Sequence, residues 1–244
     1  MTPPFTLLIV AKAPVAGLAK TRLQPACTPV EAAELAAASL LDTLATARAT
    51  PARRRVIAMT GDLADAERGA EIAQVLADGF TVIEQRGRTF ADRLVAAHLD
   101  ASELDACEVD APELGSTDPG HGPLPIVQIG MDTPQATSAQ LVAIARHVAR
   151  PGTALVAPAV DGGWWALGLH EPRHAEVLAG VPMSEPRTGA ATVAALRQRQ
   201  LRVRSGTLLR DVDYPADIAI VARACAPSSA FARAARDLSA GARR

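Results

Sequence analysis

The feature that most constrains the fold of this chain is a regular alternation of short apolar runs with longer Ala-rich stretches. Six runs have the length and the Val, Ile and Leu content of strands: residues 5–11, 55–60, 80–84, 125–130, 153–157 and 165–169. Residues 202–209 are a candidate for a further strand. Several runs are apolar throughout, which is typical of strands covered by helices on both faces of a largely parallel sheet.

The stretches between these runs are predicted to be helices. The first, at 29–49, follows Thr28 and carries Glu31 three residues later, a capping-box pattern with proline at the first helical position. Further helices are predicted at 64–77, 90–101, 138–149, 189–200, 215–224 and 229–240. This alternation predicts an α/β fold with an open, mostly parallel sheet, whose ligands bind beyond the carboxyl ends of the strands.

The expected organisation is a single domain over residues 1–226, followed by a C-terminal helix and frayed tail at 227–244. Residues 102–123 are acidic, rich in proline and glycine and without periodicity, so an irregular surface insertion is expected there. Hydrophobic residues make up 49% of the chain, enough for a sizeable core.

Charge and composition exclude several classes of function. The formal net charge of −1 provides no positive field to hold nucleic acid. Apolar runs fall far short of the roughly 20 residues of a membrane span, and no secretory signal is evident, so we expect a cytoplasmic protein. Cys27, Cys107 and Cys225 include no Cys-x-x-Cys pair, which argues against a disulfide framework and a zinc site.

A basic loop follows the first predicted strand, in the sequence AKAPVAGLAKTRL at residues 11–23. It holds Lys12 and Lys20, which are the two lysines of the chain, together with Arg22. A Walker A loop would need glycines at the positions of Pro14 and Ala19, which argues against a P-loop NTPase. The three cations favour phosphate binding slightly over a solvated turn.

Carboxylates follow the later strands. Asp132 comes after residues 125–130, Asp161 lies in a Gly-Gly turn, and Asp213 follows the candidate seventh strand beside Asp211. Carboxylates that meet near a phosphate loop are typical of Mg²⁺ sites, and Asp132 with Asp213 favours this interpretation. Asp217, in the following helix, is better explained as a turn or cap residue.

Other chemistries lack their signatures. His170 and His174 have helical spacing, but Pro172 lies between them, which disfavours a helical metal pair. No serine lies in a G-x-S-x-G context, and no G-x-G-x-x-G follows the first strand.

Taken in order, the motifs resemble a known family. They are A-K-x-P-x-x-G-x-x-K-T-R-L near the start, Q-x-G with a downstream Arg, G-x-D-x-P, P-x-x-D-G-G with two aromatics, and D-V-D-x-P-x-D. This set resembles the bacterial glycosyltransferase-like family, some of whose members are called radical-SAM/selenodomain-associated transferases. That family is similar to 2-phospholactate guanylyltransferase and other nucleotidyltransferases of GT-A fold, and the match runs from residue 7 to residue 217.

The resemblance implies a GT-A, nucleotide-diphosphosugar-transferase-like fold and a set of site residues. It implies nucleotide phosphate contacts at Lys12, Gly17, Lys20 and Arg22, and a nucleotide pocket bordered by Gln85, Gly87 and Arg93. It implies Mg²⁺ on Asp132 and Asp213, and an acceptor side shaped by Asp161, Gly162, Gly163 and Trp164. The chain departs from the family at Thr89, Phe90 and Ala91, where D-L-G is usual, and at Trp164 and Trp165, where tyrosines are commoner.

These expectations lead to three hypotheses. The first is a Mg²⁺- or Mn²⁺-dependent nucleotidyltransferase that moves a nucleoside monophosphate from an NTP to a small phosphorylated or anionic acceptor and releases pyrophosphate. Its catalytic residues would be Lys20, Arg22, Asp132 and Asp161. The second is a glycosyltransferase with an NDP-sugar donor, and the third is a non-catalytic nucleotide-binding protein on the same fold. Nothing in the sequence sets the oligomeric state.

Overall fold

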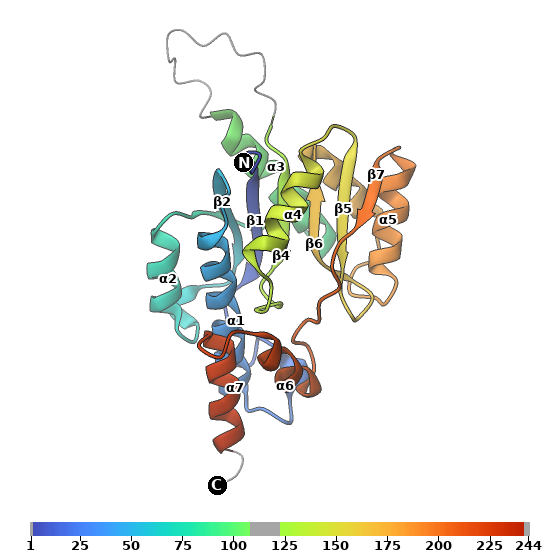
Figure 1. Ribbon diagram of the computed structural model, residues 1–244. Coiled ribbons are helices and arrows are strands. Elements are labelled where there is room, and N and C mark those ends of the chain that lie inside the picture. Colours follow the sequence, from blue (N-terminus) through green and yellow to red (C-terminus); the bar gives the residue numbers. More distant parts are fainter. Residues whose placement is uncertain (1, 108–122, 242–244) are drawn as a thin grey trace.

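The computed structural model describes residues 2–107 and 123–241, which form an α/β structure around one sheet (Figure 1). Within these residues the sheet has seven strands in the order β3-β2-β1-β4-β6-β5-β7. The strands are β1 (Thr6–Lys12), β2 (Arg54–Thr60), β3 (Thr81–Glu84), β4 (Ile126–Gly130), β5 (Thr153–Pro158), β6 (Trp164–Leu169) and β7 (Arg202–Ser205).

Strand direction confirms the mostly parallel sheet. β1 pairs in parallel with β2 and β4, β2 with β3, and β5 with β7. Strand β6 lies between β4 and β5 and is antiparallel to both. Only a few residues join β5 to β6, too few for the crossover that a parallel pair requires, so the chain turns back as a hairpin.

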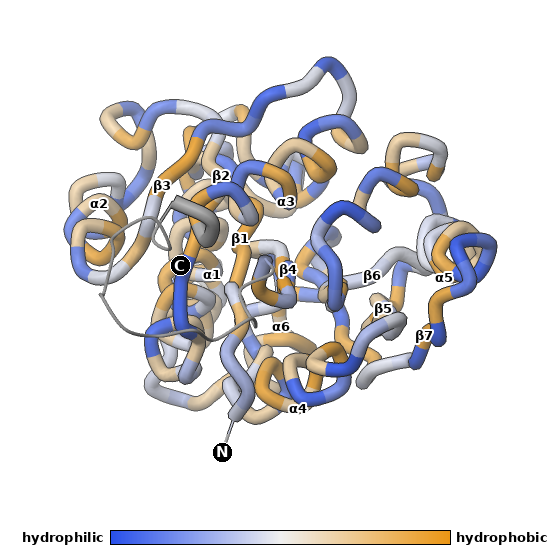
Figure 2. The backbone as a smooth tube through the Cα atoms, turned by 90° about the horizontal axis from the view of Figure 1, so that it is seen from above, coloured by the Kyte–Doolittle hydropathy of each residue, from blue (hydrophilic) through white to orange (hydrophobic). Residues whose placement is uncertain are grey.

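Helices cover both faces of the sheet. The helices are α1 (Pro29–Ala49), α2 (Gly69–Ala77), α3 (Phe90–Cys107), α4 (Ser138–Val148), α5 (Thr188–Gln198), α6 (Pro215–Ala224) and α7 (Ala230–Gly241). Alternate residues of β1 enter different layers. Leu7 and Ile9 belong to the layer that includes α1, α4 and α7, whereas Leu8 and Val10 pack with residues of α3 and α5. Figure 2 shows the hydrophobic strands β1 and β2 between these helices.

Several predicted elements are confirmed with little or no change. Helices α1 and α6 have the predicted bounds. The predicted capping box of α1 is present, because the Glu31 backbone N–H donates to Thr28 Oγ1 at 3.2 Å and the Thr28 N–H donates to Glu31 Oε2 at 2.7 Å. The apolar strand runs are found within two residues of their predicted bounds.

Two predicted helices differ from the structure. The single helix at 64–77 is wrong: a 3-10 helix, Leu63–Asp65, precedes α2, and Arg68 between them has a left-handed φ of 54°. Glycine is required at position 69, because the Cβ of any other residue would lie 1.8 Å from the Leu63 carbonyl oxygen and clash with it. Helix α3 continues to Cys107, so the first six residues of the predicted insertion are helical. The part of the insertion at 108–122 lies outside the described residues.

The second half of the chain holds two further differences. Strand β7 ends at Ser205, and the chain returns to the sheet only through an isolated bridge between Ala159 and Leu209, so the candidate strand 202–209 is too long. A 3-10 helix at Pro172–Gly180 was not predicted from the sequence. Its buried Ala175 and Leu178 join the layer of α3.

The C-terminal helix α7 packs on α1 through Phe231, which is fully buried. The Asp42 carboxylate of α1 accepts hydrogen bonds from the backbone N–H groups of Ala230 and Phe231, both at 2.8 Å. The predicted frayed end, at 242–244, lies outside the described residues. No helix in the described parts of the chain is long and apolar enough to cross a bilayer.

Candidate functional site

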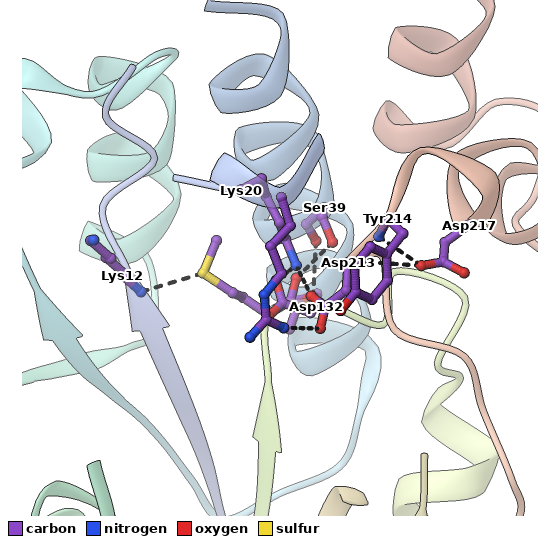
Figure 3. A network of polar contacts seen from close by, with 10 residues as sticks. Lys12, Lys20, Ser39, Asp132, Asp213, Tyr214 and Asp217 are labelled. Atoms are coloured by element: carbon purple, nitrogen blue, oxygen red, sulfur yellow. Dashed lines mark hydrogen bonds and ion pairs between the residues drawn. The ribbon is translucent and has the colours of Figure 1, made fainter. Parts of the chain in front are cut away.

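The basic loop leaves β1 at the carboxyl edge of the sheet and ends in a short 3-10 helix at Thr21–Leu23. Gly17 takes a φ of +78°, and Lys20 takes a left-handed φ of 47°. The Lys12 ammonium donates to the Leu18 carbonyl at 3.0 Å, a contact within the loop itself. Lys12 therefore braces the loop, whereas Lys20 points towards other segments of the chain (Figure 3).

Lys20 joins two of the carboxylates that the sequence singled out. Its Nζ lies 2.7 Å from Asp132 Oδ1 and 3.0 Å from Asp213 Oδ1, and only 9% of its side chain is exposed. Arg22 Nη1 lies 3.5 Å from Asp213 Oδ2, at a much more exposed position. The structure thus brings the basic loop, the end of β4 and the segment before α6 to one point (Figure 3).

The electrostatics of this cluster favour the ammonium form of Lys20. Burial alone would lower the pKa of Lys20, but the charges of Asp132 and Asp213 and their hydrogen bonds outweigh burial and raise that pKa above its ordinary value. Lys20 therefore carries its charge throughout the physiological range. The ammonium occupies a position where two carboxylates hold a cation.

Backbone contacts fix both carboxylates in place. Asp132 follows β4, and its carbonyl accepts from the Val212 N–H at 3.0 Å, while Ser39 Oγ donates to the Met131 carbonyl at 2.6 Å. Asp217 Oδ2 accepts from the backbone N–H groups of Asp213 and Tyr214 at 3.2 and 2.8 Å. Asp217 thus has the structural role predicted for it, and it fixes the backbone at Asp213 and Tyr214.

A cavity of about 570 Å³ opens beside this cluster. Its wall is formed by the ends of β1 and β4, by α3, and by residues of β6 and the segment before α5. A second hollow of about 240 Å³ adjoins it, because Lys12 and Asp132 line both. Lys20, Arg22 and Asp213 line the second hollow, so the cations sit where an extended anion could reach both spaces.

Asp211 is a third carboxylate at the cavity. Its Oδ1 is buried and has no hydrogen-bond partner among the described residues. Burial, together with the nearby charges of Asp132, Asp161 and Asp213, raises the pKa of Asp211 to about 7. Asp211 thus adds an unpaired carboxylate oxygen to the wall of the cavity.

The side chains of the described residues do not by themselves complete a metal site. Within residues 2–107 and 123–241, no group of three His, Cys, Asp or Glu side chains is arranged to hold a metal ion. Asp132 and Asp213 nevertheless fit a cation, since they already hold the Lys20 ammonium. A divalent ion there would need further oxygens from a ligand, which is how Mg²⁺ is usually held beside one or two carboxylates and substrate phosphates.

The Gly-Gly turn between β5 and β6 shapes the other side of the cavity. Asp161 and Gly163 line it, and Asp161 Oδ1 accepts from the Gly163 N–H at 2.8 Å. Gly162 lies outside the cavity wall and is required by packing: at φ +91° its Cβ would meet the Pro186 carbonyl oxygen at 1.9 Å. Trp164 lines the cavity, but its indole N–H donates to Thr192 Oγ1 at 3.2 Å.

The residues after β3 are only partly at the cavity. Gln85 lines it, and its amide nitrogen donates to the carbonyls of Ala11 and Ala58 at 2.7 and 2.9 Å, which leaves its amide oxygen as the group facing a ligand. Arg93 also lines it, with a buried Nε that has no partner among the described residues. Gly87 is not a lining residue, and its φ of +140° allows the close approach of the Arg93 backbone.

Gln128 and His98 were missed by sequence reasoning. Gln128, in the middle of β4, lines the cavity with only 2% exposure, and its Oε1 lies 2.8 Å from Nε2 of the fully buried His98. Burial lowers the pKa of His98 to about 4, so the ring is neutral. A single polar residue inside the apolar run PIVQIG was the available signal. The lining residues Met183, Ser184, Glu185 and Thr188 carried no such signal.

Comparison with known families assigns this chain to one of them. Residues 43–185, more than half of the chain, match the family described as "Uncharacterized protein conserved in bacteria (DUF2064)". The chain belongs to this family. The family resemblance drawn from the motifs is thereby confirmed. No curated protein matches the chain in sequence.

Solved structures confirm the expected fold. A putative nucleotide-diphospho-sugar transferase from Desulfovibrio desulfuricans G20 matches with a TM-score of 0.77 and 21% identity over 98% of this chain and 96% of that one. A 4-diphosphocytidyl-2C-methyl-D-erythritol synthase matches with a TM-score of 0.51 and 12% identity over 91% and 97% of the two chains. A cytidylyltransferase from Leptospira borgpetersenii serovar Hardjo-bovis matches at 0.50 and 14% over 86% and 79%. At these identities the likeness establishes the fold.

Proposed function

We propose that this chain is a divalent-cation-dependent nucleotidyltransferase. It would transfer a nucleoside monophosphate from an NTP to a small phosphorylated or anionic acceptor. The observation that carries the proposal is the meeting of Lys20 with Asp132 and Asp213 where two adjoining hollows share a wall. Cations suited to phosphate and carboxylates suited to a metal ion thus lie at one point.

The basic loop would hold the phosphates of the NTP. Lys12, Lys20 and Arg22 line the 240 Å³ hollow, so the β- and γ-phosphates would lie there. Arg22 is exposed, which lets its guanidinium bind two phosphate oxygens at once. Gln85 and Arg93 in the larger cavity would border the nucleoside.

Asp132 and Asp213 would hold Mg²⁺ or Mn²⁺ together with phosphate oxygens. The ion would supply charge neutralisation at the α-phosphate. The acceptor oxygen forms a bond to the α-phosphorus while the bond from that phosphorus to the bridging β-oxygen breaks, and pyrophosphate leaves with the electron pair. Lys20 and Arg22 would stabilise the charge that develops on this leaving group.

The acceptor would occupy the part of the cavity bordered by Asp161, Gly163 and Trp164. Asp161 keeps one carboxylate oxygen for the Gly163 N–H, so the other is available to orient an acceptor hydroxyl. Both tryptophan indole N–H groups are already used within the protein, since Trp165 Nε1 donates to the Thr207 carbonyl at 2.8 Å. Trp164 would therefore offer the face of its ring.

Glycosyl transfer from an NDP-sugar is the second candidate. The size of the larger cavity and the carboxylate of Asp161 at its wall favour it, because a sugar would fit between Asp161 and the metal carboxylates. The protein from Desulfovibrio desulfuricans G20 is described as a putative nucleotide-diphospho-sugar transferase. The difference lies in the leaving group: pyrophosphate in one reaction and a nucleoside diphosphate in the other.

A thermal-shift screen separates these candidates. The purified chain would be tested with the common NTPs and with NDP-sugars, each with and without Mg²⁺. We expect metal-dependent stabilisation by an NTP, followed by pyrophosphate release once an acceptor is added. Stabilisation by an NDP-sugar alone would favour glycosyl transfer. Nucleotide binding unchanged by Asp132→Asn and Lys20→Ala would contradict the proposed site.

A further inference from the structure

The cation position of the candidate site is already filled by a side chain of the protein. Lys20 Nζ lies within 3.0 Å of one oxygen from each of Asp132 and Asp213, and its side chain is nine-tenths buried. Arg22 approaches the second oxygen of Asp213 at 3.5 Å. The two carboxylates are thus balanced by two cations of the protein itself.

We infer that Lys20 is an internal counter-ion that must leave Asp132 and Asp213 before they bind a divalent cation, so that metal and nucleotide bind together. This inference rests on the proposed function and concerns the order in which its ligands bind. An ammonium and a divalent cation repel each other strongly when both contact the same carboxylate oxygens, so the metal is held more tightly once Lys20 has moved away.

The coordination available in the protein explains why the nucleotide is needed. Among the described residues, no three acidic or other ligating side chains form a metal site. A free divalent ion would therefore gain two carboxylates and would have to displace the Lys20 ammonium, whose side chain is nine-tenths buried. A nucleoside triphosphate removes both obstacles to metal binding. Its phosphates offer further oxygen ligands to the metal, and they give Lys20 a new anionic partner.

The movement required is small. The hollow where phosphates would lie is lined by Lys20 together with Asp132 and Asp213, so the ammonium already borders that space. A lysine side chain has a flexible four-carbon stem and reorients without a change in the backbone. The loop is held by its own hydrogen bonds, including those of the Leu18 and Ala19 N–H groups to the Val15 carbonyl at 3.0 and 2.9 Å.

Mn²⁺ binding to the nucleotide-free chain tests the inference. Bound Mn²⁺ would be measured at pH 8 by electron paramagnetic resonance and by water-proton relaxation, for wild type, Lys20→Met and Lys12→Met. We expect Lys20→Met to bind Mn²⁺ at least about tenfold more tightly than wild type, because one positive charge is removed from the carboxylates. Lys12→Met is the matched control, since the Lys12 ammonium contacts a carbonyl oxygen, and should resemble wild type.

Two further measurements keep the result interpretable. Lys20→Arg retains the cation and should bind nucleotide-free Mn²⁺ as weakly as wild type, and circular dichroism would confirm that each variant is folded. Each of the four common NTPs would then be added to wild type, where at least one should raise protein-bound Mn²⁺ by about tenfold or more.

The outcomes separate the inference from the proposed function. Nucleotide-free wild type that binds Mn²⁺ as tightly as Lys20→Met would overturn the counter-ion role of Lys20 and leave the metal site in place. Absence of bound Mn²⁺ in every variant, with or without NTP, would overturn the proposed metal site itself. Tighter binding in both Lys20→Met and Lys12→Met would show a general charge effect and would also overturn the inference.

Discussion

Two polar clusters border the same cavity, and they are built in opposite ways. The Lys20–Asp132–Asp213 cluster is fully charged and opens to a second hollow, whereas the His98–Gln128 pair is neutral and almost completely buried. Charges are costly to bury and remain exchangeable where a ligand can replace one partner. A neutral pair fixes the orientation of an amide at modest cost. The charged cluster is therefore suited to binding and exchanging ligands, and the neutral pair is suited to fixing the shape of the cavity wall.

The sharpest test of this contrast is Asp132→Asn. The change keeps the size of the side chain and removes one of the two carboxylates that would hold the metal. We expect kcat/KM for pyrophosphate release to fall by about 100- to 1000-fold, the range seen when one charge-stabilising group is lost from a site. Asp78→Asn, at an exposed ion pair with Arg48, should change activity by less than about twofold. Full activity in Asp132→Asn would place the chemistry elsewhere.

The neutral pair predicts a dependence of stability on pH. His98 has a pKa of about 4 in the folded protein and 6.5 as its ordinary value. Between pH 6.5 and pH 4, His98 is protonated in the unfolded chain but stays neutral in the folded chain. The free energy of unfolding is therefore highest above pH 6.5 and decreases as the pH falls to 4. The difference of about 2.5 between these pKa values corresponds to a loss of up to about 3 kcal/mol.

Urea unfolding of wild type and His98→Leu between pH 4 and pH 7.5 would isolate this effect. The raised pKa of Asp211 acts in the opposite sense, because its contribution is lost as the pH rises through about 7. Both proteins contain Asp211, so its contribution cancels in the difference. Parallel stability curves for the two proteins would mean that His98 is not held neutral.

Breaking the pair at fixed pH should have a somewhat smaller effect. His98→Leu leaves the Gln128 amide oxygen buried without its donor, which costs about 1–3 kcal/mol of unfolding free energy. Adding Gln128→Leu removes the orphaned group, so the double variant should recover part of the loss. Urea unfolding at pH 7.5 closes this double-mutant cycle. Strictly additive losses would show that the two side chains do not depend on each other.

The smallest effect is expected at the edge of the charged cluster. The Lys12 ammonium contacts the Leu18 carbonyl instead of a carboxylate. Lys12→Met should weaken NTP binding by less than about fivefold, in the range of an exposed charge contact. Isothermal titration of Lys12→Met and Lys20→Met with the same NTP would compare the two lysines. A larger loss in Lys12→Met would reverse the roles given to them.

Much of the fold was accessible from local patterns. Apolar runs marked the strands, and the Thr28–Glu31 capping box marked the start of α1, because these features depend on neighbouring residues. The predictions failed where distant contacts decide. The helix predicted at 64–77 is interrupted at the left-handed Arg68, where the Gly69 backbone packs closely on the Leu63 carbonyl, and β6 is antiparallel because the chain reverses in the short turn after β5.

The sequence by itself determined which residues could take part in the site, because phosphate and cation chemistry need particular side chains and the motifs supply them in order. It did not place Lys20 against Asp132 and Asp213, which lie more than a hundred residues further along the chain. Only the tertiary structure decided that pairing, since neighbouring strands β1 and β4 end side by side and the Val212 N–H donates to the Asp132 carbonyl, which brings the segment before α6 to the same point. The same folding made His98 a neutral partner of Gln128, because the layer between α3 and the sheet excludes water.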